Sequence, residues 1–132
     1  MDISLFQSCC QGELEAVRIA LCNGASTSWR NSQGFSPLLA AARNGHTDIC
    51  GLLLKHGSNV NETHSISKST ALHFAAQYGH DEIVTILLNH GANIKIVTED
   101  KLTALDFAKR NNHEQIIKYL TSLDFRINDT SK

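Results

Sequence analysis

The sequence predicts an all-α solenoid of four helix-turn-helix units joined by hairpin loops, with the first and last units acting as caps. Three observations predict it. Short motifs recur every 33 or 34 residues, hydroxyl residues and glycines mark the starts and ends of helices, and paired apolar residues recur on every second helix. Helices of about nine residues are marginal alone. Each unit must therefore bury its apolar stripe against its neighbours.

The repeat is clearest in a tetrad that occurs three times, at spacings of 34 and 33 residues: Ser36-Pro37-Leu38-Leu39, Thr70-Ala71-Leu72-His73 and Thr103-Ala104-Leu105-Asp106. A second pattern keeps the same spacings and adds a degenerate first unit: Gly12-Glu13, Gly45-His46, Gly79-His80 and Asn112-His113. These spacings predict one repeat domain over residues 1–124 and a short tail over 125–132. Its four units are predicted at 3–31, 32–64, 65–97 and 98–124.

The first helix of each unit begins at an N-cap residue, Ser36, Thr70 or Thr103, whose side-chain oxygen can accept a free backbone N–H. Pro37 suits the first helical position, where its missing N–H has no cost. The helix is rich in alanine, which lets neighbouring helices approach closely. Gly45 ends it by permitting positive φ, as Gly79 does in the next unit.

The second helix of each unit carries apolar residues at positions i, i+1, i+4 and i+5, which form one stripe. The stripe residues are Ala16, Val17, Ala20 and Leu21; Ile49, Cys50, Leu53 and Leu54; Ile83, Val84, Leu87 and Leu88; and Ile116, Ile117 and Leu120. Gly24, Gly57 and Gly91 end these helices.

The two ends of the repeat array differ from its middle. Lys109 occupies the slot that holds Ala42 and Ala76 in the earlier units, and Thr121 occupies the slot of Leu54. Polar residues in these slots predict that nothing packs beyond the fourth unit. In the first unit, polar residues enter the alanine-rich helix and no tetrad precedes it. Both end units are therefore predicted to be caps.

Composition argues against several classes of function. The chain has 12 basic and 13 acidic residues, which is not the basic surplus of a nucleic-acid-binding protein. The longest apolar run, Ile49–Leu54, is far shorter than the roughly 20 residues of a membrane helix. The first residues show no signal-peptide pattern. The four cysteines form no C-x-x-C motif, so we expect reduced thiols in the cytoplasm or nucleus.

The third unit resembles the ankyrin repeat. The residues that carry the resemblance are Thr70-Ala71-Leu72-His73, Ala75-Ala76, Gly79-His80, Ile83-Val84, Leu87-Leu88 and His90-Gly91-Ala92-Asn93. With its partners in the other units, the pattern covers about residues 3 to 124. The resemblance implies L-shaped units with hairpins at right angles to the helices. It also implies binding of another protein through a concave side, formed by hairpin tips and the exposed side of the first helices.

Carried onto this sequence, that concave side comprises Trp29, Arg30, Ser32, Gln33, Phe35, Arg43, Asn44, His64, Ile66, Lys68, Ser69, Gln77, Tyr78, Glu99, Asp100, Leu102, Arg110 and Asn111. For Trp29, Phe35 and Leu102, local packing is an equal alternative. The pairs Arg43-Asn44 and Gln77-Tyr78 are favoured, because they precede the terminating glycines and face away from the stripes.

The hairpins depart from the family pattern. Lys68 and Lys101 stand where Gly34 stands in the first full hairpin, a slot that favours positive φ. A lysine there costs energy unless the turn changes type. The middle hairpin also has one extra residue between Gly57 and Thr70. Its geometry is left open by the sequence.

Seven histidines raise the question of a metal site. His46, His80 and His113 occupy equivalent slots, but packed helices lie about 8 to 10 Å apart. Zinc–nitrogen bonds of about 2.0 to 2.1 Å cannot bridge that spacing. We expect no metal and assign these histidines to turn and loop hydrogen bonds. His73 is predicted to bond to a neighbouring loop, whereas the sequence suggests no structural role for His64.

The function predicted from the sequence is a non-catalytic protein-interaction module: an inhibitor, adaptor or scaffold that binds another protein or peptide segment. We expect it to be monomeric when unbound, with no cofactor, nucleic acid or membrane. A mild surplus of basic residues on the hairpins and first helices would favour an acidic segment. The alternative is a thiol enzyme that uses Cys10 with a histidine. Cys9 falls in the buried slot of Ala42, and no phosphate-binding loop or H-E-x-x-H motif occurs.

Overall fold

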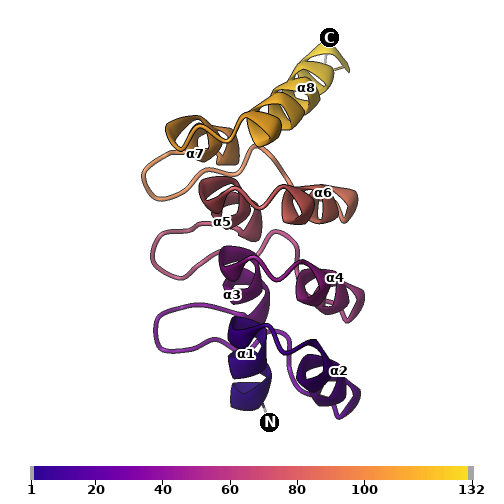
Figure 1. The fold of residues 1–132 in the computed structure, drawn as a ribbon. Coiled ribbons are helices and arrows are strands. Elements are labelled where there is room, and N and C mark those ends of the chain that lie inside the picture. The colour runs from indigo at the N-terminus through magenta and orange to yellow at the C-terminus, as the bar shows by residue number, and fades with distance from the viewer. Residues whose placement is uncertain (1, 131–132) are drawn as a thin grey trace.

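The computed structural model describes residues 2–130, with side chains for residues 2–124 (Figure 1). These residues form helices and no strands, which confirms the all-α prediction. The helices are α1 (Asp2–Gln11), α2 (Leu14–Cys22), α3 (Pro37–Asn44), α4 (Thr47–Lys55), α5 (Ala71–Tyr78), α6 (Asp81–Asn89), α7 (Ala104–Arg110) and α8 (Glu114–Thr130).

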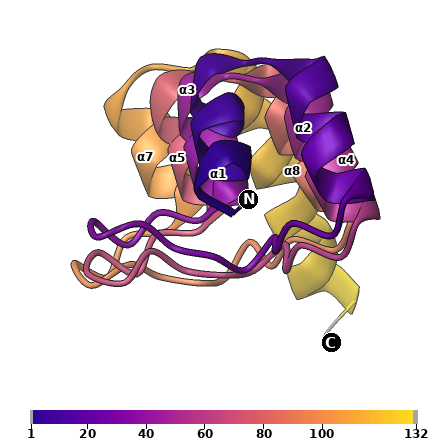
Figure 2. The same ribbon diagram turned by 90° about the horizontal axis from the view of Figure 1, so that it is seen from below.

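The helices form two layers. The first helices of the units, α1, α3, α5 and α7, pack in sequence as an inner layer, and α2, α4, α6 and α8 pack as an outer layer. Figure 2 shows the hairpin loops projecting together from one end of the helices, past the inner layer. The hairpins and the inner helices therefore enclose an angle, which we call the concave surface.

The inner helices begin where the tetrads predict. The N-cap oxygens of Ser36, Thr70 and Thr103 accept N–H groups three residues later, at 3.3, 3.4 and 3.2 Å. Thr70 and Thr103 complete capping boxes, in which the side chains of His73 and Asp106 accept the N-cap N–H at 2.9 Å. The predicted caps are confirmed.

The core lies between the layers and between successive units. The alanines of α3 and α5 are buried, as the close approach of the inner helices requires. The outer helices bury Val17 and Leu21; Ile49, Cys50, Leu53 and Leu54; Ile83, Val84 and Leu87; and Ile116 and Leu120. Ala16 is exposed, although its position in α2 is equivalent to that of the buried Ile49 in α4. In the described residues no unit lies on that side of α2.

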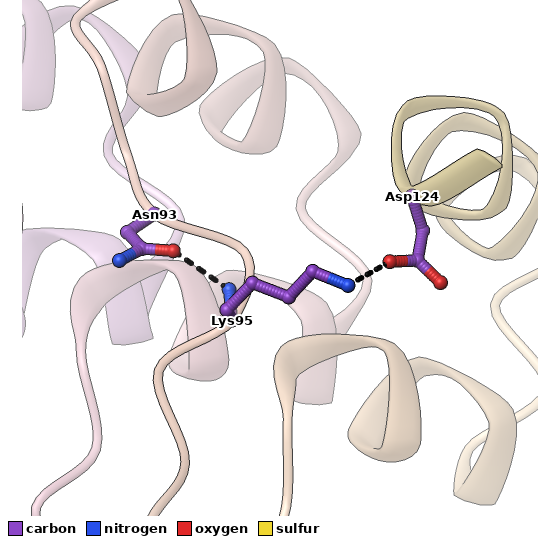
Figure 3. A network of polar contacts seen from close by, with 3 residues as sticks. All are labelled: Asn93, Lys95 and Asp124. Atoms are coloured by element: carbon purple, nitrogen blue, oxygen red, sulfur yellow. Dashed lines mark hydrogen bonds and ion pairs between the residues drawn. The ribbon is translucent and has the colours of Figure 1, made fainter. Parts of the chain in front are cut away.

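The last helix of the fourth unit extends past residue 124, the predicted end of the repeat domain. Lys109 and Thr121 are exposed, but α8 continues to Thr130, while residues 131–132 lie outside the described part. An ion pair between Lys95 and Asp124 joins α8 to the loop after α6 (Figure 3). The backbone N–H of Lys95 donates to Asn93 Oδ1 at 2.9 Å. The loop thus holds the lysine in position for the helix.

The three hairpins share a residue with positive φ at the same position, in spite of their different sequences. Gly34, Lys68 and Lys101 all have positive φ, at 88°, 62° and 67°. The lysines therefore adopt the left-handed conformation. In each hairpin one backbone bond closes the ends, such as that from His64 N–H to Ser69 O at 2.8 Å, and a second closes the turn. The second bond spans four residues in the middle hairpin, from Lys68 N–H to His64 O, and three in the other two, so the middle turn is wider. The inserted residue lies in the tip of the middle hairpin, between His64 and Ser69.

Candidate functional site

The predicted site residues divide into three groups by exposure. Two are buried, His64 and Ser69. Five are partly buried: Trp29, Arg30, Phe35, Gln77 and Leu102. The remaining eleven are exposed: Ser32, Gln33, Arg43, Asn44, Ile66, Lys68, Tyr78, Glu99, Asp100, Arg110 and Asn111. Side chains able to meet a partner thus lie on the hairpin tips and at the ends of the inner helices.

Arg43 and Phe35 form the best-defined cluster on this surface. The guanidinium carbon of Arg43 lies 5.4 Å from the centroid of the Phe35 ring, which is cation–π distance. Phe35 also packs against His64 at 4.6 Å and Phe74 at 5.5 Å between centroids. The aromatic cluster beneath the hairpins therefore holds one face of Phe35 and presents the arginine above it.

Tyr78 lies at the end of the next inner helix, in the slot equivalent to Asn44. It is 45% exposed, which makes it one of the most exposed large apolar side chains in the described residues. Its ring lies 6.3 Å from the ring of His80. Asn44 is held differently, because its Nδ2 donates to the carbonyl oxygen of Cys10 at 3.2 Å.

Trp29 and Arg30 have local contacts of their own. Trp29 lies 5.4 Å from Phe6 between ring centroids. Arg30 donates from Nη1 to the carbonyl oxygen of Gly34 at 2.9 Å, which braces the first full hairpin. The ring contacts of Trp29 and Phe35 therefore support the local-packing alternative for these two residues.

The sequence suggests no structural role for His64, but the structure shows one. Its side chain is 9% exposed, and its Nδ1 accepts the backbone N–H groups of Ile66 at 3.2 Å and Ser67 at 3.3 Å. Asn31 does the same in the first full hairpin, accepting from Gln33 and Phe35. Counting forward from Gly57 puts His64 in the Asn31 slot, so the sequence held this signal. His64 organises the tip rather than projecting from it.

The tip that His64 organises presents Ile66, whose side chain is 73% exposed. Two hydrogen bonds brace the tip, one within it and one from the next hairpin. Lys68 Nζ donates to Ser65 O at 3.0 Å, and the N–H of Glu99 in the next hairpin donates to Ser67 O at 2.8 Å. An exposed isoleucine therefore stands on a loop that hydrogen bonds hold in place.

The equivalent histidines His46, His80 and His113 join successive units, and their ring nitrogens reach helix carbonyls and not the turn and loop groups that the sequence predicts. Their Nε2 atoms lie 3.0, 3.1 and 2.9 Å from carbonyl oxygens near the end of the preceding inner helix. His73 Nε2 lies 3.1 Å from Leu102 O in the next hairpin, which confirms its predicted loop contact. Among the side chains that the structure describes, those of residues 2–124, no cluster of three or more His, Cys, Asp or Glu residues could hold a metal ion.

Sequence reasoning missed a second reason for the glycine that follows each of the first three inner helices, Gly12, Gly45 and Gly79. A Cβ on Gly45 would lie 2.8 Å from the His80 ring, well inside normal contact distance. Gly12 and Gly79 face the next histidine in the same way. In the fourth unit the slot holds Asn112, with φ of 58°. The glycine thus makes room for the following unit as well as ending the helix.

Three of the four cysteines, Cys9, Cys10 and Cys50, have raised pKa values. Burial raises the pKa values of Cys9 and Cys50 to about 12. Burial also raises the pKa of Cys10, although the nearby charge of Arg43 opposes the shift. Nucleophilic cysteines have lowered pKa values. The direction at Cys10 therefore counts against the thiol-enzyme alternative.

Stacked helix pairs with hairpins at one end define a helical repeat protein. The family model "Ankyrin repeats (3 copies)" matches residues 3–64 and 56–131, and the chain belongs to the ankyrin repeat family. Ankyrin repeats generally act as protein–protein interaction modules. Within residues 2–130, no helix is both long and apolar enough to cross a membrane.

Curated relatives match about half of the chain. A probable E3 ubiquitin-protein ligase XBOS33 of Oryza sativa subsp. japonica is 38% identical over 65 residues, 49% of this chain and 12% of that protein. The Ankyrin repeat and KH domain-containing protein CBG24701 of Caenorhabditis briggsae is 36% identical over 49% of this chain and 2% of its own length. The human Histone-lysine N-methyltransferase EHMT1 is 39% identical over 59 residues, which are 43% of this chain and 4% of that protein. The chain thus spans a small fraction of each, and the similarity lies in the repeats.

Proposed function

We propose that this chain is a non-catalytic interaction module that binds one protein partner through its concave surface and acts by occupancy, as an inhibitor, adaptor or scaffold. The observation that carries the proposal is the arginine held over the Phe35 ring, with the exposed Tyr78 on the next inner helix. Arginine and tyrosine are the residue types that concentrate binding energy at interfaces.

Preorganisation supports the same surface. Arg43 lies over an aromatic ring and Ile66 stands on a braced tip, so each loses little freedom when a partner binds. Ile66 could enter an apolar pocket of the partner. Arg43 and Tyr78 would contact the partner deeper in the angle between the hairpins and the inner helices.

Charge supports an acidic partner segment. Five basic side chains are exposed on the hairpins and inner helices: Arg43, Lys68, Lys101, Lys109 and Arg110. On the same elements Glu99 and Asp100 are exposed, whereas Asp106 is partly buried and occupied by its capping box. The exposed balance on these elements is therefore basic, which steers and orients a partner with a complementary charge.

The four free thiols support a reducing compartment, so we assign the module to the cytoplasm or nucleus. The raised pKa of Cys10 supports a non-catalytic role over the thiol-enzyme alternative. We propose that the chain is monomeric until it binds.

The test begins with a pull-down and mass spectrometry to identify a stoichiometric partner. Binding of that partner is then measured for Arg43→Ala and Tyr78→Ala by calorimetry. A true anchor loses at least about 2 kcal/mol, or roughly thirtyfold in affinity. Lys118→Ala, an exposed change on the outer helix α8, is the control and should have little effect. If Lys118→Ala abolishes binding and both concave variants bind normally, the proposed surface is wrong.

A further inference from the structure

Three side chains occupy equivalent positions near the ends of the inner helices: Arg43 in α3, Gln77 in α5 and Arg110 in α7. The backbone is held alike at the first two, because Arg43 O and Gln77 O lie 3.1 and 2.9 Å from the histidine Nε2 of the next unit. The three helices pack in sequence (Figure 1). The three positions therefore form one line across the concave surface, which we call the concave row.

Both ends of the concave row carry an exposed positive charge. Arg43 and Arg110 are exposed, and no ion pair among the side chains of residues 2–124 involves either one. The helices α3, α5 and α7 expose no acidic side chain, since Asp106 is partly buried and occupied by its capping box. The exposed Glu99 and Asp100 belong to the third hairpin and not to these helices. The helix side of the concave surface is therefore basic.

The spacing of the two arginines fits an extended peptide. Packed helices lie about 8 to 10 Å apart, so residues two units apart are separated by about 16 to 20 Å. An extended chain rises about 3.3 Å per residue, and its side chains alternate between two faces. About five or six residues cover the distance, but only the sixth returns to the same face. Carboxylates on residues i and i+6 would therefore both face the row.

The middle of the concave row suits the backbone of such a segment. Gln77 is partly buried, and the exposed Tyr78 follows it. A side-chain amide both donates and accepts hydrogen bonds, as a peptide backbone does. At one end of the row, Arg43 is already held over the Phe35 ring, so it loses little freedom when a carboxylate binds.

We propose that the concave row binds an extended segment of the partner with two acidic residues six positions apart, one against Arg43 and one against Arg110. The backbone between them lies over Gln77. This proposal rests on the function proposed above, and it adds the conformation and the charge pattern of the bound segment. A helical segment rises only about 1.5 Å per residue, so its two charges would have to lie about 11 to 13 residues apart.

The experiment uses a phage-displayed library of random 16-residue peptides, panned on the full chain and counter-selected against the double variant Arg43→Glu and Arg110→Glu. The expected peptides share Asp or Glu at positions i and i+6. The affinity of a selected peptide is then measured by fluorescence polarisation. One alanine inserted between its two acidic residues should reduce the affinity at least tenfold, because the second carboxylate turns to the opposite face.

Single variants test the two contacts separately. Arg43→Ala and Arg110→Ala should each reduce peptide affinity at least tenfold. Each should have little further effect on a peptide in which the matching acidic residue is replaced by its amide, as expected for directly coupled groups. Lys118→Ala removes the same charge from the outer helix α8 and should bind the peptide as the wild type does. Unchanged melting temperatures show that the exposed substitutions leave the fold intact.

The outcomes separate this proposal from the proposed function. The proposal is overturned if the selected peptides share no i, i+6 acidic pair, or if they tolerate the inserted alanine. Acidic residues about 11 to 13 positions apart would overturn it in favour of a helical segment. In each of these cases the concave surface still stands if the partner from the pull-down depends on Arg43 and Tyr78. If that partner also ignores both residues, the proposed function fails as well.

Discussion

The Nε2 atom of His80 lies 3.1 Å from the carbonyl oxygen of Arg43, in the preceding unit. The bond joins the start of one outer helix to the end of the neighbouring inner helix. It therefore fixes the backbone from which the Arg43 side chain reaches over Phe35. The same contact depends on Gly45, whose missing side chain leaves room for the imidazole.

Replacing Gly45 with alanine should therefore reduce the free energy of unfolding by more than the cost of a left-handed alanine alone. Gly45 and Gly57 both have positive φ, at 81° and 94°. A Cβ on Gly57 would meet no atom within 4 Å, whereas one on Gly45 would meet the His80 ring. We expect Gly57→Ala to lose about 1 kcal/mol of unfolding free energy in urea titrations, and Gly45→Ala clearly more. Equal losses would mean that the histidine moves aside at no cost.

The apolar stripe of the outer helices should dominate stability. Leu87 is fully buried, so Leu87→Ala should reduce the free energy of unfolding by about 2 to 5 kcal/mol. Ile19→Ala is the control, because Ile19 is 59% exposed and should lose less than about 1 kcal/mol. A small loss at Leu87 would show that the units are not held by this stripe.

Acid should weaken the fold through His73. Burial lowers the pKa of this histidine, against opposing contributions from backbone hydrogen bonds and from Asp106. Its Nδ1 accepts the Thr70 N–H, so the folded state holds the neutral ring. The unfolded chain then binds more protons below about pH 6.5, and stability falls from that pH down through the lowered folded pKa. In urea titrations at several pH values, His73→Gln should show a shallower fall. An unchanged slope would place the pH dependence elsewhere.

The thiols should differ in their reaction with Ellman's reagent. Cys22 is exposed and should react first, and Cys10 should follow slowly because burial raises its pKa. Cys9 and Cys50, with pKa values of about 12, should react only on unfolding. Labelling of single-cysteine variants assigns each rate. If Cys10 reacted faster than Cys22, the thiol-enzyme alternative would regain support.

The repeat spacing was enough to predict the helices, their caps and the buried stripes, because these depend on residue type at fixed intervals. The hairpin tips were not predictable in the same way. Lys68 and Lys101 adopt a conformation that lysine disfavours, since the surrounding closing bonds impose the turn. The sequence suggested no role for His64, because the inserted residue obscured its alignment with Asn31.

The candidate surface was only partly predictable, because exposure depends on neighbours in other units. Tyr78 is exposed as expected, but Phe35 is partly covered by His64 in the middle hairpin and by Phe74 in the next inner helix. The continuation of α8 beyond residue 124 also had no counterpart in the earlier units.

The contact between each histidine and the preceding inner helix has a consequence for lengthening the molecule. Each internal unit supplies the histidine for the unit before it and the glycine for the unit after it. A second copy of residues 46–79 inserted directly after Gly79 would recreate both junctions with native residues on each side. Gene duplication could therefore extend the array and keep the histidine–glycine contact at each junction, and each added copy would lengthen the concave surface by one hairpin and one inner helix.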